Sequence, residues 1–205
     1  MQGLKRLTVA DMKRANVPDR FWNVRLQSIP TDLVYRQKVK NYLERLDDMT
    51  KRGAGLFLWS DENSTGKTSI AVLVVKQALR LRKTAFFEES GRLKTALIKN
   101  EEFEDRTSLE SRVRRVDVFV LDDIGKEYRT ETGFAENLIE SILRERSQMM
   151  KTTIMTGNIS PKAIEKIYSR DLAALLREIM IPIEVVGIDW RKEKANELKQ
   201  LVQGE

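Results

Sequence analysis

The residues best suited to chemistry lie in one polar segment, Ser60-Asp61-Glu62-Asn63-Ser64-Thr65-Gly66-Lys67-Thr68, between an apolar run and a helical pattern. Backbone N–H groups of such a loop and of the next helical turn can bind phosphate oxygens. The Lys67 ammonium would reach the β- and γ-phosphates, and the Thr68 hydroxyl would ligate Mg²⁺. The segment therefore predicts a nucleotide site with these contacts: Asn63, Ser64, Thr65, Gly66, Lys67, Thr68 and Ser69.

This loop departs from the pattern G-x-x-x-x-G-K-[ST], which requires glycine at position 61, where the chain has Asp61. A carboxylate facing a polyanion is unfavourable unless its side chain turns outward. Alternatively, the loop is one residue longer and Asn63 supplies the left-handed conformation that glycine usually adopts. We expect weak nucleotide affinity or slow turnover in either case. A chance Gly-Lys-Thr at the start of a surface helix is the competing interpretation of the motif alone.

Two further polar groups follow apolar runs. Val118-Phe119-Val120-Leu121 ends in Asp122 and Asp123, and Thr152–Thr156 is followed by Gly157 and Asn158. The carboxyl ends of parallel strands carry the ligands of open α/β sheets. Asp122 would then hold Mg²⁺, Asp123 would polarise the attacking water, and Asn158 would contact the γ-phosphate or that water. Each motif alone is also typical of a turn, but three in this order favour one site.

Composition excludes several other chemistries. The 205 residues contain no cysteine and no histidine, which rules out disulfides, thiolate metal sites and imidazole bases. No apolar run is long enough to span a membrane and no signal-peptide stretch precedes residue 20, so we expect a cytoplasmic protein. The formal charge is +6, and residues 1–52 carry the whole surplus. A basic segment of this kind indicates a polyanionic partner or simply a solvated lead-in.

The pattern of elements predicts an α/β fold. Residues 1–30 lack apolar periodicity and are expected to form an extended basic arm with one short helix, before a domain that spans 31–205. Thr31 and Asp32 are expected to cap a helix that ends near Arg52-Gly53. Short apolar runs then alternate with helical stretches, and strands are expected at 56–59, 85–87, 118–121, 152–155 and 183–186. This alternation favours a five-stranded parallel sheet covered on both faces. Residues 100–111 look most like a loop.

Several motifs together resemble the AAA+ ATPases of the DnaC/DnaI helicase-loader and IstB group. They are Val17–Trp22, Gly55–Leu58, Gly66-Lys67-Thr68, Leu121-Asp122-Asp123-Ile124-Gly125, Leu143–Arg146, Thr156-Gly157-Asn158 and Gly187–Arg191. The resemblance implies ATP and Mg²⁺ as cofactors and a P-loop sheet of order 5-1-4-3-2. It also implies that Asn158 is sensor 1, that Arg191 is sensor 2, and that Arg146 is the arginine ending the helix after the Asp-Asp strand.

The chain departs from this family at the arginine finger, whose usual position falls on Ala174-Leu175. Arg170 and Arg177 flank it on one helix face, and either could reach the nucleotide of a neighbouring subunit in a homo-oligomer. The family's loaders add helices between the second strand and the Asp-Asp strand, facing DNA. Here that span would offer these cations to single-stranded DNA: Arg92, Lys94, Lys99, Arg106, Arg112, Arg114 and Arg115.

The resemblance leaves three functions open. The first is an ATP-dependent loader that binds single-stranded DNA and places a DnaB-type hexameric helicase. The second is an IstB-like transposase helper, although only about 50 residues precede the core, which leaves no room for that class's DNA-binding domain. The third is a catalytically weakened scaffold. Partner recognition would use the arm, where Phe21 and Trp22 either anchor the partner or pack on the chain's own core.

Overall fold

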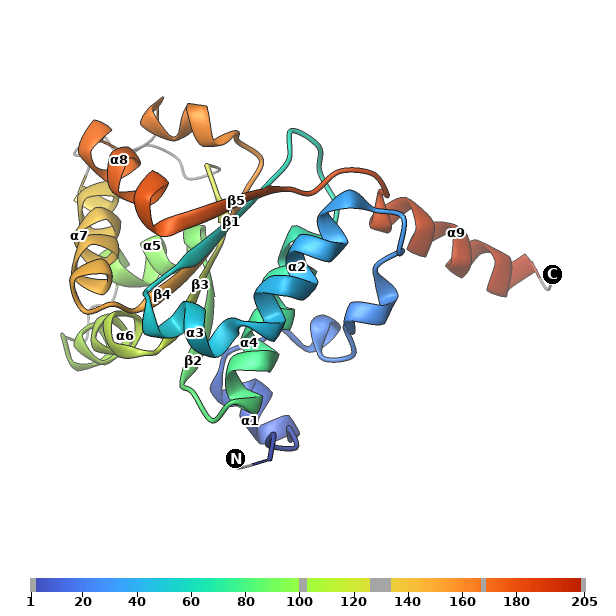
Figure 1. The fold of residues 1–205 in the computed structure, drawn as a ribbon, viewed down its shortest axis with the longest axis horizontal. Helices are drawn as coiled ribbons and strands as arrows, with labels where there is room; N and C mark the ends of the chain where they lie inside the picture. The colour runs from blue at the N-terminus through green and yellow to red at the C-terminus, as the bar shows by residue number, and fades with distance from the viewer. Residues whose placement is uncertain (1–2, 100–102, 126–133, 167–168, 204–205) are drawn as a thin grey trace.

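The protein is built on a five-stranded parallel sheet (Figure 1). The computed structural model describes residues 3–99, 103–125, 134–166 and 169–203. Its strands are β1 (Gly55–Trp59), β2 (Ala85–Glu89), β3 (Val118–Ile124), β4 (Thr152–Gly157) and β5 (Met180–Glu184). They lie in the order β2-β3-β4-β1-β5, and each pair of neighbouring strands is parallel. The predicted sheet order is therefore confirmed, and β4 lies between the strands that carry the other two motifs.

Helices cover both faces of this sheet (Figure 1). One face packs against α2 (Val34–Glu44), α3 (Leu46–Lys51), α4 (Lys67–Arg80) and the N-terminal segment, in a core that includes Leu56, Leu58 and Val120. The opposite face packs against α5 (Ser90–Lys99), α6 (Phe103–Arg115), α7 (Phe134–Gln148) and α8 (Arg170–Ile179). Because both faces are covered, the central strands β1, β3 and β4 are buried along most of their length rather than at alternate residues. A final helix, α9 (Trp190–Gln203), projects from the body.

Residues 3–30 lie against the sheet domain instead of extending from it. They form α1 (Val9–Arg14) and two 3₁₀ turns, η1 (Asp19–Phe21) and η2 (Leu26–Ser28). Met12, Ala15 and Val17 enter the core, and Phe21 and Trp22 pack against it. The N–H of Phe87 donates to the carbonyl of Ala15, so this segment covers part of the free edge of β2. The expectation that the two aromatics pack on the chain's own core is confirmed, whereas the extended conformation is wrong.

The first long helix also begins later than its capping pattern predicts. Thr31 and Asp32 do not cap it; α2 starts at Val34, and its N-cap, Leu33, has no side-chain cap bond. Leu33 instead packs in an extended conformation against the core beside Gly187. Arg45 then separates α2 from α3. Tertiary packing of Leu33 therefore outweighs the local capping signal.

Three other boundaries differ from those expected. Residues 103–111, predicted as loop, belong to α6, whose last turns are held by the buried Val113 and by ion pairs from Arg114 to Glu110 and Glu145. Residues 100–102 lie outside the described residues. β5 begins at Met180, three residues early, because it pairs with β1 from Gly55 onward; its Pro182 is tolerated on an edge strand. Helices are expected from the sequence pattern across 161–179, but residues 161–166 form a 3₁₀ turn, η3.

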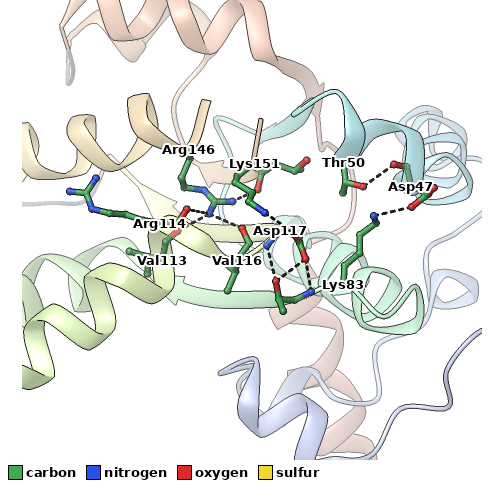
Figure 2. A network of polar contacts seen from close by, with 11 residues as sticks. Asp47, Thr50, Lys83, Val113, Arg114, Val116, Asp117, Arg146 and Lys151 are labelled. Carbon is green, nitrogen blue, oxygen red and sulfur yellow. Dashed lines mark hydrogen bonds and ion pairs between the residues drawn. The ribbon is translucent and has the colours of Figure 1, made fainter. Parts of the chain in front are cut away.

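A buried arginine joins α6, α7 and β4 (Figure 2). Arg146 is fully buried, and its guanidinium donates to the carbonyls of Val113 at 2.7 Å, Val116 at 2.9 Å and Thr152 at 2.6 Å, and to the Thr153 hydroxyl at 2.9 Å. Burial lowers its pKa to about 9, which leaves it charged at neutral pH. Arg146 thus satisfies carbonyls at the C-terminus of α6, which would otherwise lack partners.

Among the described residues, no helix is long and apolar enough to cross a membrane.

Candidate functional site

A cavity of about 470 Å³ lies at the carboxyl ends of β1, β3 and β4. All of the predicted nucleotide and metal contacts line it, from Asn63 to Ser69 together with Asp122, and so do Asp123, Asn158 and Arg191. A larger cavity of about 890 Å³ lies between the N-terminal segment, α2 and α4 and contains none of these residues. The chemistry of the lining, rather than the volume, therefore identifies the site.

The loop before α4 contains two left-handed residues. Ser64 has φ +64° and Gly66 has φ +97°, whereas Asn63 does not have a positive φ, so the predicted left-handed Asn63 is wrong. Ser64, rather than Asn63, therefore adopts the left-handed conformation in the turn that leads into α4. Asp61 is exposed and does not line the cavity, which is the outward orientation that a polyanion requires. Inside the loop, the Ser60 hydroxyl accepts a bond from the N–H of Glu62.

The N-terminus of α4 opens into this cavity. Gly66 is its N-cap and provides no side-chain acceptor for the first-turn N–H groups. Such N–H groups carry the positive end of the helix dipole and are the usual donors to a phosphate. The loop therefore fits an anion.

Lys67 lies at the wall of the cavity and is buried. Its ammonium donates to the carbonyl of Glu62 at 2.8 Å and to the Thr65 hydroxyl at 3.2 Å. A phosphate oxygen entering the loop would offer this ammonium a charge-assisted bond, which is stronger than a bond to either of these two neutral acceptors.

The oxygen ligands suited to Mg²⁺ are already grouped. Asp122 is buried and accepts hydrogen bonds from the hydroxyls of Thr68 at 3.1 Å and Thr156 at 2.7 Å. Burial raises the pKa of Asp122 to about 6, against the lowering effect of these two bonds. In the described ranges, no group of three or more acidic side chains is placed so that it could hold a metal ion by itself. Mg²⁺ bound through one carboxylate, one hydroxyl and phosphate oxygens is the arrangement that these residues fit.

Asp123 and Asn158 complete the wall. Asp123 follows Asp122 in β3, and its backbone is left-handed, with φ +63°. The Asn158 amide donates to the side-chain oxygen of Asn63 at 2.7 Å, so the third motif touches the first. The three strand ends thus bring together the side chains that the sequence predicted to meet.

The start of α9 closes one side of the loop. Asp189 caps this helix by accepting from the N–H groups of Arg191 and Lys192. The N–H of Trp190 donates to the carbonyl of Ser64, and a Cβ on Gly66 would lie 3.1 Å from the indole nitrogen. Trp190 therefore joins α9 to the loop before α4 and places Arg191 at the cavity.

Sequence reasoning missed seven residues of this wall: Arg20, Phe21, Val24, Glu89, Thr156, Trp190 and Lys194. Two of them carried a usable signal. Thr156 lies two residues before Asn158 on one strand, and Trp190 precedes Arg191. The η1 residues carried none, because only tertiary packing brings that turn to the cavity. There the guanidinium of Arg20 lies over the Phe21 ring at 4.5 Å.

Arg170 and Arg177 are not part of this cavity. Both are exposed on α8, and Arg177 pairs with Glu165 at 2.7 Å. The structure places neither beside the chain's own candidate nucleotide site, so their action on a neighbouring subunit remains a prediction.

Comparisons with known proteins support the fold. No family model matches the sequence, and no curated protein matches it. The fold is similar to a DnaI crystal structure, with a TM-score of 0.70, 20% identity, and coverage of 84% of this chain and 93% of that one. A crystal structure of the DnaC helicase loader is similar with a TM-score of 0.69 and 21% identity, and the match covers 82% of this chain and 100% of that one. AMPPCP-bound DnaA from Aquifex aeolicus is similar with a TM-score of 0.63 and 18% identity, and the match covers 80% of this chain and 50% of that one. The chain therefore has the fold of these DnaI and DnaC structures, as the resemblance of its motifs implied.

Proposed function

We propose that this protein binds and hydrolyses ATP as a helicase loader. The observation that carries the proposal is the convergence of Lys67, Asp122 and Asn158 from three strand ends on one cavity. The relatives in fold support it, because one of them is named a helicase loader and another is DnaA bound to the ATP analogue AMPPCP. Mg²⁺ would neutralise charge on the β- and γ-phosphates when bound by Thr68 and Asp122.

The chain's own residues would divide the work of phosphoryl transfer. Lys67 and the α4 N-terminus bind and orient the phosphates, Asp123 orients the attacking water, and Asn158 and Arg191 contact the γ-phosphate. Asp123 has a shorter reach than a glutamate. We therefore retain the expectation of weak affinity or slow turnover; micromolar ATP binding with ordinary turnover would contradict it.

The first experiment tests the nucleotide site. Lys67→Ala should abolish detectable hydrolysis and weaken ATP binding at least about tenfold, since one charged contact to phosphate is lost. Lys51→Ala, on the exposed face of α3, is the matched control and should leave both unchanged. Hydrolysis that survives in Lys67→Ala would count against the proposal, and ATP binding without hydrolysis in the wild-type protein would favour the scaffold alternative.

The second experiment tests single-stranded DNA binding. DnaA is known bound to AMPPCP and single-stranded DNA, and it shares this fold. Of the predicted DNA-facing cations, Arg92 and Arg115 are exposed on α5 and α6. Arg114 forms ion pairs with Glu110 and Glu145, and the Arg112 guanidinium lies over the Phe86 ring, 4.3 Å from its centroid. The side chains of Lys99 and Arg106 lie outside the described residues.

Double replacement of Arg92 and Arg115 by Ala should therefore weaken DNA binding and reduce its salt dependence. Fluorescence anisotropy with a labelled oligothymidine at several salt concentrations measures both. Arg52→Ala is the control, because it is exposed on the opposite side of the sheet, at the end of α3. Equal affinity and salt slope in the double variant would exclude α5 and α6 as the DNA surface.

The partner is tested by a pull-down with purified DnaB-type helicase, with and without ATP. Retention of the helicase supports a loader. A parallel pull-down with a purified transposase tests the IstB-like alternative, which retention of the transposase without the helicase would favour. Sedimentation with and without ATP tests the proposed homo-oligomer. If either arginine acts on the nucleotide of a neighbouring subunit, Arg170→Ala or Arg177→Ala should lower the rate of ATP hydrolysis without altering ATP binding.

A further inference from the structure

Thr156 connects both acidic residues of the candidate site through a single hydroxyl group. Its Oγ1 donates to Oδ1 of Asp122 at 2.7 Å and accepts from the backbone N–H of Asp123 at 2.9 Å. Thr156 is 1% exposed, so water does not readily replace either bond. One buried side chain of β4 therefore fixes a carboxylate and the neighbouring peptide group of β3.

The backbone of β3 explains why this contact matters. Successive side chains of a regular strand point to opposite faces of the sheet, so Asp122 and Asp123 would not share a cavity in an unbroken strand. Pairing between β3 and β4 shifts register between Leu121 and Ile124, and Asp123 adopts a φ of +63°. This irregularity brings both acidic residues to one cavity.

A left-handed aspartate is strained and persists only where its surroundings hold it. The peptide groups of Asp123 are held on two sides. Its N–H is bonded to Thr156, and its carbonyl accepts from the Ser90 hydroxyl of α5 at 3.0 Å. Ser90 is also 1% exposed. The two hydroxyls, from β4 and α5, form a clamp on the strained residue.

We propose that Thr156 is a positioning residue of the nucleotide site, which fixes the Asp122 carboxylate for Mg²⁺ and holds Asp123 in its left-handed conformation. The inference rests on the proposed ATP binding. It assigns no contact with substrate to Thr156. Loss of such an outer partner typically costs about tenfold or more in metal affinity or activity.

A second threonine of β4 provides the matched control. Thr152 is fully buried like Thr156, but its hydroxyl has no hydrogen-bond partner among the residues that the structure describes. Thr152→Val removes a buried hydroxyl from the same strand without touching the site. Thr156→Val removes the bridging hydroxyl with nearly the same change in shape, and Thr156→Ser restores it.

The experiment measures Mn²⁺ binding by electron paramagnetic resonance in the presence of ADP, fluorescent ATP binding with and without Mg²⁺, and hydrolysis at saturating MgATP. Thr156→Val should weaken Mn²⁺ binding and lower kcat each by about tenfold, and leave metal-free nucleotide affinity unchanged. Thr156→Ser should recover most of both losses. Thr152→Val should match wild type in all three measurements.

Wild-type metal affinity and kcat in a folded Thr156→Val protein would overturn the inference, as would equal losses in Thr152→Val. Failure of wild type to bind ATP would instead overturn the proposed function. Circular dichroism melting checks folding. If Thr156→Val does not fold, Ser90→Ala tests the other half of the clamp and should lower kcat with metal-free ATP binding intact; an unchanged kcat overturns the inference.

Discussion

Individual buried residues of this protein owe their roles to partners distant in sequence. Arg146 donates to carbonyls of α6 and β4 and to a hydroxyl of β4 (Figure 2). The ring of Phe119 lies 5.4 Å from its guanidinium. A charge buried this deeply is stable only while its hydrogen-bond acceptors surround it, so the residue couples α6, α7 and the sheet.

Arg146→Met should lower the free energy of unfolding by about 3 kcal/mol, because several buried carbonyls would lose their donor at once. Urea denaturation followed by circular dichroism measures the change. Arg144→Ala is the control, since Arg144 lies on the same helix with a side chain 41% exposed and a weak ion pair at 3.8 Å. Its expected effect is below about 1 kcal/mol. Equal stability of the two variants would contradict a structural role for Arg146.

Gly66→Ala should reduce nucleotide affinity about tenfold or more. A Cβ at this left-handed position would lie 3.1 Å from the Trp190 indole nitrogen, so the loop or α9 must move. Isothermal titration with ATP and Mg²⁺ measures the affinity. Gly91→Ala, whose Cβ would meet nothing within 4 Å, should bind ATP like wild type. Unchanged affinity in Gly66→Ala would show that the loop geometry is not required.

Elements at the edge of the fold depend on local capping as well as packing. Thr8 and Asp11 form a reciprocal capping box at the start of α1. Lys5 pairs with Asp11 at 2.6 Å. The bond with Lys5 has the largest effect on the Asp11 carboxylate and the bonds from Thr8 have the next largest. Together they lower the pKa of Asp11 from 3.8 to about 2. The carboxylate form therefore favours the folded state.

Asp11→Asn should destabilise the protein by about 1 kcal/mol at pH 7, the usual value of a helix cap. Because the folded-state pKa is below the ordinary value, the difference from wild type should be constant above about pH 5 and shrink as pH falls towards 2. Urea unfolding of both proteins between pH 7 and pH 3 measures it. A difference that grows on acidification would contradict the assignment.

The predicted elements were correct where the apolar pattern was strong. Strand positions could be predicted because buried β-strands are continuous apolar runs, and α4 because it follows a glycine and is apolar. α6 was missed because its stability comes from Arg146 and from α7, which its polar sequence does not reveal.

At the scale of the whole molecule, the N-terminal segment and the sheet domain share one core. Lys76 of α4 is buried, and its ammonium donates to the carbonyls of Trp22 and Val24, each at 2.7 Å. Burial, with Arg80 and Arg25 nearby, lowers the pKa of Lys76. The same stretch of chain supplies Arg20 and Phe21 to the candidate nucleotide cavity. Anchoring by Lys76 therefore supports the site.

Lys76→Met should release the segment around residues 20–26. We expect about 1–3 kcal/mol of destabilisation, because two buried carbonyls lose their donor, and faster hydrogen exchange in this stretch than elsewhere. Lys38→Met, on the exposed face of α2, controls for the loss of one charge. Uniform exchange in both variants would contradict the anchoring role.

The sequence alone predicted the residues of the candidate site, and its resemblance to a known family implied the order of the strands. The types and spacing of Lys67, Thr68, Asp122, Asp123 and Asn158 predicted a site that the structure assembles, because strand ends in a parallel sheet meet at one edge. Only the tertiary structure placed Thr156, Trp190 and the η1 turn at that site and drew residues 3–30 into the core. Those contacts join residues far apart in the sequence; Lys76 and Trp22, for example, are separated by 54 positions. Local periodicity and capping rules carry no information over such separations, so packing decided them.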